Sequence, residues 1–144
     1  MSGKRPQCMA GLAGERERIR VLVACRSACL RDAVGQLFQG EGAFELVGST
    51  GDGQEAVQLA KDLTADLVLM DLNMPRMGGL EATRSIKAHQ DAPVVILCAL
   101  DDSEQVRAAA KAAGADAFVP KAPRMTANLQ AEIRRAFAGL GLEC

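Results

Sequence analysis

The sequence predicts an α/β domain built on a doubly wound parallel sheet, and three observations lead to this prediction. Short apolar runs alternate with segments of helical period, and Gly, Pro, Asp or Ser marks each switch. Most of the runs are unbroken rather than alternating, as is typical of strands that are buried on both faces. Parallel strands joined by helices cross over right-handed, which places helices on both faces of one sheet.

Five strands and five helices are expected along the chain. The strands follow the apolar runs 19–24, 44–49, 67–70, 94–98 and 115–119. Apolar side chains recur with the spacing of one helix face in the stretches 30–38, 56–63, 80–86, 106–113 and 129–140. Gly40, Gly114 and the segment 91–93 lie just past helical stretches, where we expect a left-handed cap or a helix stop.

Length and composition fit a single ordinary globular domain. The chain has 144 residues, of which 49% are apolar and 24% are charged. We expect residues 1–18 to be a disordered leader and residues 19–144 to form the domain. The leader lacks an apolar stretch long enough for a signal peptide or a membrane span. We therefore expect a cytoplasmic protein that does not bind a membrane.

Several other classes of function are disfavoured. The five cysteines are scattered, odd in number and without CxxC spacing, which argues against a disulfide framework and against a zinc site. The formal net charge is −1 and no basic run stands out, so we expect no direct nucleic-acid binding. The single histidine, His89, lies at the end of a helical stretch, away from the strand ends. The sequence does not indicate an enzyme.

Ligands of an open parallel sheet bind beyond the carboxyl ends of its strands. The chemically capable residues at those predicted ends are Cys25, Arg26, Asp71, Asn73, Cys98 and Lys121. Asp71 directly follows a buried strand, where a charge is unusual. The plainest interpretation of Asp71 is a helix N-cap, but the helical pattern resumes only near 78–79, which is too late. The plainest interpretation of Lys121 is a solvated lysine before Pro123.

The runs ADLVLMDLNMPRMGGLEA (65–82) and FVPK (118–121) resemble the receiver domain of bacterial two-component response regulators. The likeness covers residues 19–140. The run FELVGSTGDGQEAVQLA (44–60) is similar to the subfamily that often carries a helix-turn-helix output domain. The resemblance implies a flavodoxin-like fold with strand order 2-1-3-4-5.

The resemblance also implies roles for individual residues. Asp71 aligns with the aspartate that accepts a phosphoryl group from a histidine kinase, and Lys121 aligns with the lysine that contacts the phosphate. Asn73 matches the residue whose backbone carbonyl helps to hold Mg²⁺. Cys98 occupies the place of a Ser or Thr that follows the phosphate, and Phe118 matches the aromatic residue that turns inward on activation.

The opening stretch departs from the family pattern, because Cys25 and Arg26 occupy its two acidic positions. At an effective dielectric near 20, a unit charge at about 4 Å is worth roughly 4 kcal/mol, so the exchange should weaken a Mg²⁺ site severely. No cofactor is therefore expected, with weak Mg²⁺ binding through Asp71 and Asn73 as the alternative. The Arg26 guanidinium either pairs with Asp71 or points into solvent. In a third version, Arg26 and Lys121 bind a phosphate dianion without metal.

Three hypotheses of function follow. The leading one is a degenerate receiver that works as a protein-interaction switch, with a homodimer as one form that the resemblance allows. Its partner is a histidine kinase or another signalling protein, and the resemblance implies binding through the fourth helix, fifth strand and fifth helix (101–113, 116–119 and 123–138). The second hypothesis is a conventional Mg²⁺-dependent phosphoacceptor. The third is a thiol redox sensor based on Cys25 and Cys98, although two strand spacings exceed the reach of an unstrained disulfide.

Overall fold

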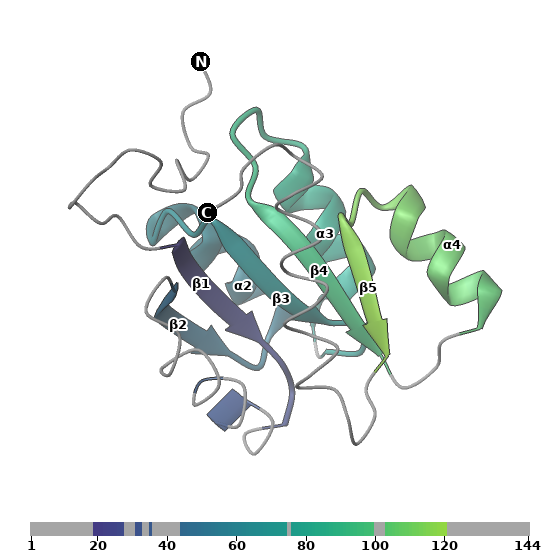
Figure 1. The fold of residues 1–144 in the computed structure, drawn as a ribbon, viewed down its shortest axis with the longest axis horizontal. Helices are drawn as coiled ribbons and strands as arrows, with labels where there is room; N and C mark the ends of the chain where they lie inside the picture. Colours follow the sequence, from purple (N-terminus) through teal and green to yellow (C-terminus); the bar gives the residue numbers. More distant parts are fainter. Residues whose placement is uncertain are drawn as a thin grey trace.

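A computed structural model describes residues 19–27, 31, 32, 35, 44–74, 76–99 and 103–120. Five parallel strands form one sheet in the order β2-β1-β3-β4-β5 (Figure 1). The strands are β1 (Ile19–Ala24), β2 (Phe44–Thr50), β3 (Leu67–Asp71), β4 (Val94–Ala99) and β5 (Ala117–Pro120). The helices are α2 (Gly53–Asp62), α3 (Gly79–Lys87) and α4 (Glu104–Ala112). The predicted fold class and strand order are confirmed.

The centre of the sheet is its most apolar part. Every residue of β3 and β4 is buried, and five of the six residues of β1 are buried as well. Their side chains divide between two apolar clusters, which we call cluster one and cluster two, on opposite faces of the sheet. The edge strand β2 is mostly half-buried. Burial on both faces explains why the central strands appear as unbroken apolar runs in the sequence.

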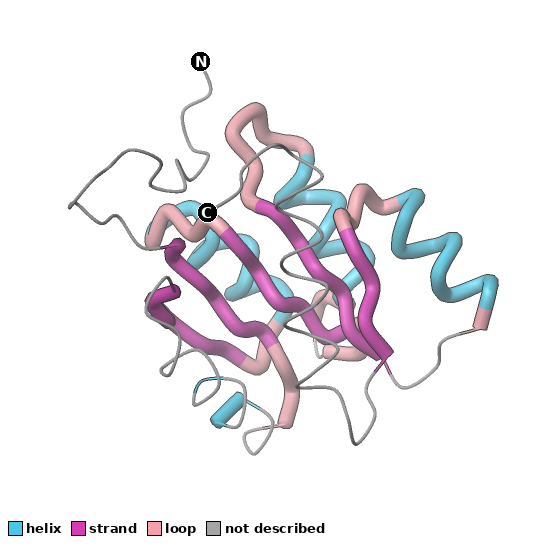
Figure 2. The backbone as a smooth tube through the Cα atoms, viewed as in Figure 1, coloured by secondary structure: helices cyan, strands magenta, loops and turns pink. Residues whose placement is uncertain are grey.

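Helices α2 and α3 pack against the face of the sheet that carries cluster two, as Figure 2 shows behind the strands. Each buries small residues on one side, for example Ala56 and Ala60 in α2 and Ala82 in α3. The Asp52 side chain accepts a hydrogen bond from the Gln54 N–H and so caps α2, and Ser103 caps α4 through Val106 N–H. These caps fix the start of each helix just after its strand.

The strand bounds differ from the prediction by one or two residues. β2 extends to Thr50 because its carbonyl accepts a hydrogen bond from Cys25 N–H (2.9 Å), and β3 extends to Asp71. β5 begins at Ala117 rather than at residue 115, and the side chain of Asp116 just before it accepts a hydrogen bond from Val95 N–H of β4 at 2.9 Å. Gly114 has φ of 101°, as expected of a left-handed helix cap.

Several predicted elements lie outside the described residues. These are the leader 1–18, Gly40, most of the first helix and the whole of the fifth helix at 129–140. Residues 31, 32 and 35 of the first helix are described and are helical. Within the described ranges, no helix combines the length and apolar character that a membrane span requires.

Candidate functional site

Asp71 is the charged residue at the centre of the sheet edge formed by the carboxyl ends of the strands. It is the last residue of β3 and pairs in register with Cys98 of β4. On the other side, Met70 pairs with Ala24, so Cys25 follows β1 directly beside Asp71. Only 5% of Asp71 is exposed, although it carries a carboxylate. The topology therefore gathers Cys25, Asp71 and Cys98 at one place, as the sequence predicts.

The carboxylate of Asp71 is surrounded by hydrogen-bond donors. Its Oδ2 lies 3.6 Å from Cys25 Sγ and 3.5 Å from the backbone nitrogen of Arg26. Its Oδ1 accepts from the backbone N–H of Asn73 at 3.3 Å. The backbone of the next residue is held as well, because Leu72 N–H donates to the Cys98 carbonyl at 2.9 Å. A thiol and two backbone amides are thus among the polar contacts of this carboxylate.

Arg26 meets Asp71 through its backbone and not through its guanidinium. The side chain of Arg26 is exposed, and none of the ion pairs among the described residues joins it to Asp71. Of the two conformations left open by the sequence, the structure has the one directed to solvent. In this conformation the positive charge of Arg26 lies outside the pocket, where water screens it.

Arg31 is a residue of this site that the sequence reasoning missed. Its Nη1 donates to the Cys25 carbonyl at 2.6 Å and reaches the Arg26 carbonyl at 3.5 Å. The guanidinium therefore ties the helical segment at Arg31 to the turn that follows β1. An arginine seven residues after the end of β1 gives no pattern that would predict this bond.

Cys25 and Cys98 are buried thiols on either side of β3, 5% and 4% exposed. Because β3 lies between their strands, their backbones are separated by about 10 Å, two strand spacings. That separation exceeds the span of a disulfide. Both side chains belong to cluster one, so their bodies pack as small apolar groups.

Phe118 lies on the other face of the sheet. It pairs in register with Leu97 and packs, half-buried, against cluster two. The guanidinium carbon of Arg107 in α4 lies 4.9 Å from the centre of its ring. The structure therefore places Phe118 beside α4 and does not bring it to Asp71. Lys121 lies outside the described residues, as do Cys8, Cys29 and Cys144.

The other end of the sheet carries a surface cavity of about 320 Å³. Thr64, Ala65, Ala92 and Pro93 line it just before β3 and β4 begin, and His89 lines it as well. His89 is therefore at the opposite end of the strands from Asp71, as predicted. In the described part of the chain, no group of three or more His, Cys, Asp or Glu side chains is arranged to hold a metal ion.

Comparison with known proteins agrees with this geometry. A family model described as the response regulator receiver domain matches residues 21–134. The transcriptional regulatory protein PdtaR of Mycobacterium tuberculosis is 42% identical over 102 residues, which cover 71% of this chain and 49% of that protein. The chain thus spans about half the length, or less, of the curated relatives that it matches.

Two solved structures show the same fold. The response regulator domain of Thermotoga maritima CheB has a TM-score of 0.77 at 27% identity, and the match covers 85% of this chain and 98% of that one. A CheX-CheY-BeF3-Mg complex of Borrelia burgdorferi gives a TM-score of 0.76 at 26% identity, covering 83% and 89%. A buried aspartate at the end of β3, the strand order and the family match all agree: the chain belongs to the response regulator receiver domains of two-component signalling.

Proposed function

We propose that this protein is a degenerate receiver, a protein-binding switch in which Asp71 keeps the place of the phosphoacceptor but is phosphorylated weakly or not at all. The observation that carries the proposal is the set of groups around Asp71. The positions that are acidic in similar receivers hold a buried thiol at Cys25 and an exposed side chain at Arg26. The carboxylate accepts hydrogen bonds where a metal-binding pocket needs further oxygen ligands.

The donor set around Asp71 does not fit Mg²⁺. This cation is hard, takes oxygen ligands and demands nearly ideal octahedral geometry. Cys25 offers sulfur, and the Arg26 backbone directs an N–H at Asp71 Oδ2. A cation beside Oδ2 would meet the positive end of that N–H dipole. Each lost carboxylate at about 4 Å removes roughly 4 kcal/mol of attraction at an effective dielectric near 20.

Metal-free binding of a phosphate dianion receives less support from this arrangement. The described groups that contact Asp71 point at the carboxylate itself, and the Arg26 guanidinium faces solvent. To hold a phosphoryl group, Arg26 would have to turn inward and give up its hydration. A thiol at Cys98 would also bond a phosphate oxygen weakly, because S–H is a poor donor.

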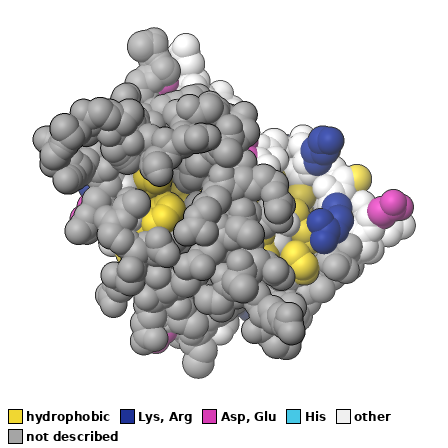
Figure 3. Space-filling view, viewed as in Figure 1, with side chains coloured by type: hydrophobic (Ala, Val, Ile, Leu, Met, Phe, Trp, Pro, Cys, Tyr) yellow, Lys and Arg dark blue, Asp and Glu magenta, His cyan; other side chains and the backbone are white. Residues whose placement is uncertain are grey.

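The partner of such a switch is a histidine kinase or another signalling protein. We place the binding surface on α4, β5 and the segment 123–138, of which the last lies outside the described residues. The described part combines an aromatic ring at Phe118 with a stacked arginine, a combination that is enriched at protein interfaces. In Figure 3, basic and apolar side chains lie next to each other over this part of the molecule. We propose that the protein acts in the cytoplasm by binding and without an enzymatic activity of its own.

Labelling with a phosphodonor tests this function. The protein is incubated with a small-molecule phosphodonor and Mg²⁺, and intact mass is followed over time, with Asp71→Asn as the matched control. We expect little or no gain of a phosphoryl group in the wild type. Stoichiometric labelling that disappears in Asp71→Asn would contradict the proposal and favour the conventional Mg²⁺-dependent phosphoacceptor.

The thiol redox sensor is the less favoured alternative. Ionising Cys25 would set a thiolate beside the carboxylate of Asp71, and two like charges at that separation repel. Burial of Cys25 adds to this penalty. If Cys25 nevertheless reacted with an alkylating agent much faster than Cys8 and Cys144, the redox function would become the better explanation.

A further inference from the structure

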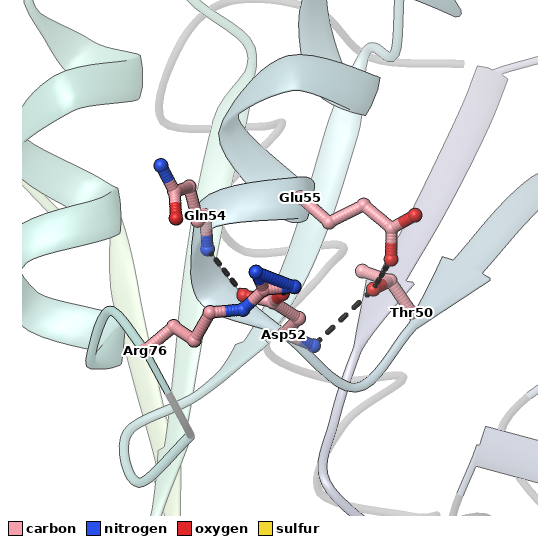
Figure 4. Close-up of polar contacts among 5 residues, drawn as sticks. All are labelled: Thr50, Asp52, Gln54, Glu55 and Arg76. Atoms are coloured by element: carbon pink, nitrogen blue, oxygen red, sulfur yellow. Dashed lines mark hydrogen bonds and ion pairs between the residues drawn. The ribbon is translucent and has the colours of Figure 1, made fainter.

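We propose that an ion pair between Asp52 and Arg76 is a clamp that orders the loop between β3 and α3, beside Asp71, without a metal ion. Arg76 Nη2 lies 2.6 Å from Asp52 Oδ2 (Figure 4). Asp52 follows β2, and Arg76 belongs to the loop that follows β3. The pair therefore joins two loops at the edge of the sheet that carries the candidate site.

Asp52 is held in place from both sides, so the clamp has a rigid anchor. Its Oδ1 accepts from the Gln54 N–H at 2.8 Å and caps α2, and its own N–H donates to Thr50 Oγ1 at 3.2 Å. The Thr50 hydroxyl in turn donates to Glu55 (Figure 4). Because only 14% of the Asp52 side chain is exposed, against 66% of Arg76, Asp52 is the fixed partner and Arg76 reaches over to it.

The backbone of Arg76 indicates that the loop is held against its local preference. Its φ is 66°, in the left-handed region that residues with a Cβ seldom adopt. Such a conformation persists where surrounding contacts determine it. The described contacts that bear on Arg76 include the ion pair with Asp52.

Two glycines show how closely the loop is seated between its neighbours. A Cβ on Gly53 would lie 1.9 Å from the Met77 carbonyl oxygen, and a Cβ on Gly79 would lie 2.3 Å from the Asp71 carbonyl oxygen. The loop is thus pressed against the start of α2 on one side and against the end of β3 on the other. If the loop moved at Arg76, the close contacts at Gly53 and Gly79 would both change.

The same loop carries Asn73, whose N–H donates to Asp71 Oδ1. A clamp at Arg76 therefore orients the carboxylate through Asn73, and both members are positioning residues. This inference rests on the proposed function, since it names what orders the loop once the acidic metal ligands are gone. In a metal-binding receiver, the cation itself would join Asp71 to the Asn73 carbonyl.

Amide hydrogen exchange in metal-free buffer tests the clamp. Asp52→Asn keeps the cap of α2, because Asn caps as well as Asp does, but it removes the charge. We expect Asp52→Asn and Arg76→Gln to speed exchange at Asn73 and Met77 about two- to fivefold, the range of an exposed ion pair. Arg76→Lys should retain most of the protection. High salt should raise the exchange rates of the wild type toward those of the variants.

The control is Lys87→Gln, which breaks the other ion pair of the described residues, Lys87 with Asp116, at the opposite end of the sheet. It should leave exchange at Asn73 unchanged. Unaltered exchange in both Asp52→Asn and Arg76→Gln in metal-free buffer would overturn the clamp. Saturable Mg²⁺ binding by the wild type would overturn the proposed function, while the metal-free exchange rates would still decide the clamp.

Discussion

At the scale of the residue, the chemistry of this receiver is set by what touches one carboxylate. Asp71 is 5% exposed and yet contacts a thiol and two backbone amides. These contacts offset part of the desolvation that burial of the carboxylate costs.

Restoring the acids should restore the metal site. In the double variant Cys25→Asp, Arg26→Asp, we expect affinity for Mg²⁺ to rise roughly tenfold or more, because two carboxylates return beside Asp71. Isothermal titration calorimetry measures the change. The same double substitution in an Asp71→Asn background is the control and should lose the gain. An affinity equal to that of the wild type would mean that the side chains at 25 and 26 do not limit the metal site.

The two adjacent glycines at the start of α3 should respond unequally to an added methyl group. At Gly79, the added Cβ would lie 2.3 Å from the Asp71 carbonyl oxygen, so Gly79→Ala should lower the free energy of unfolding by about 1–3 kcal/mol or more. At Gly78, the nearest atom is 3.6 Å away and φ is −71°, so Gly78→Ala should stay within about 1 kcal/mol of the wild type. Urea denaturation compares the two, and equal losses would contradict this geometry.

The residue scale is also where sequence reasoning reached its limit. The sequence placed Cys25, Asp71 and Cys98 together because strand ends of a parallel sheet share one edge. It left the direction of the Arg26 side chain open, because a rotamer depends on solvent and on neighbouring side chains. The spacing of residues in the sequence does not determine it. Sequence reasoning missed the bond from Arg31 to the Cys25 carbonyl and the pair of Asp52 with Arg76 for the same reason, because both depend on the conformation of a long side chain.

At the scale of the element, the strands and helices are joined by polar ties outside the apolar clusters. Asp116, just before β5, accepts from Val95 N–H of β4 at 2.9 Å and from Lys87 Nζ of α3 at 2.8 Å. Lys87 also donates to the Pro93 carbonyl at 3.0 Å. One carboxylate therefore connects three elements at the amino end of the sheet, far from Asp71.

Removing this tie should destabilise the domain. Asp116→Ala leaves the Val95 N–H and the half-buried Lys87 ammonium without their acceptor, so we expect a loss of about 1–3 kcal/mol in the free energy of unfolding. The control is Asp91→Ala, an exposed carboxylate in the turn after α3, which should change stability by less than about 0.5 kcal/mol. Thermal or urea unfolding gives both values. Equal effects would show that the three-way contact adds nothing.

Element bounds followed from the sequence to within a residue or two, and the misses have physical causes. The start of α3 at Gly79 was expected, since helical spacing resumes there after Pro75. The ends of β2 and β3 were predicted short, because Thr50 and Asp71 are polar, while ladder hydrogen bonds depend on the backbone alone. The start of β5 was predicted early, because Ala115 is apolar but lies outside the strand, which begins at Ala117.

At the scale of the whole molecule, the fold and the pocket chemistry have become separable. The five strands and their order depend on apolar runs that bury both faces of the sheet, and none of those runs needs Cys25 or Arg26 to be acidic. The receiver fold therefore does not depend on which residues stand at positions 25 and 26. Under the proposed function, the surface around α4 and β5 would serve a partner even without a metal site.

The most direct test of this account is a Mg²⁺ titration of the wild-type protein followed by the NMR shifts of the Asp71, Leu72 and Asn73 amides. We predict no saturable change up to millimolar Mg²⁺, with the wild type and Asp71→Asn giving the same titration. Saturable shifts in the wild type at or below low millimolar Mg²⁺, abolished by Asp71→Asn, would show that a divalent cation binds beside this carboxylate and would contradict the account.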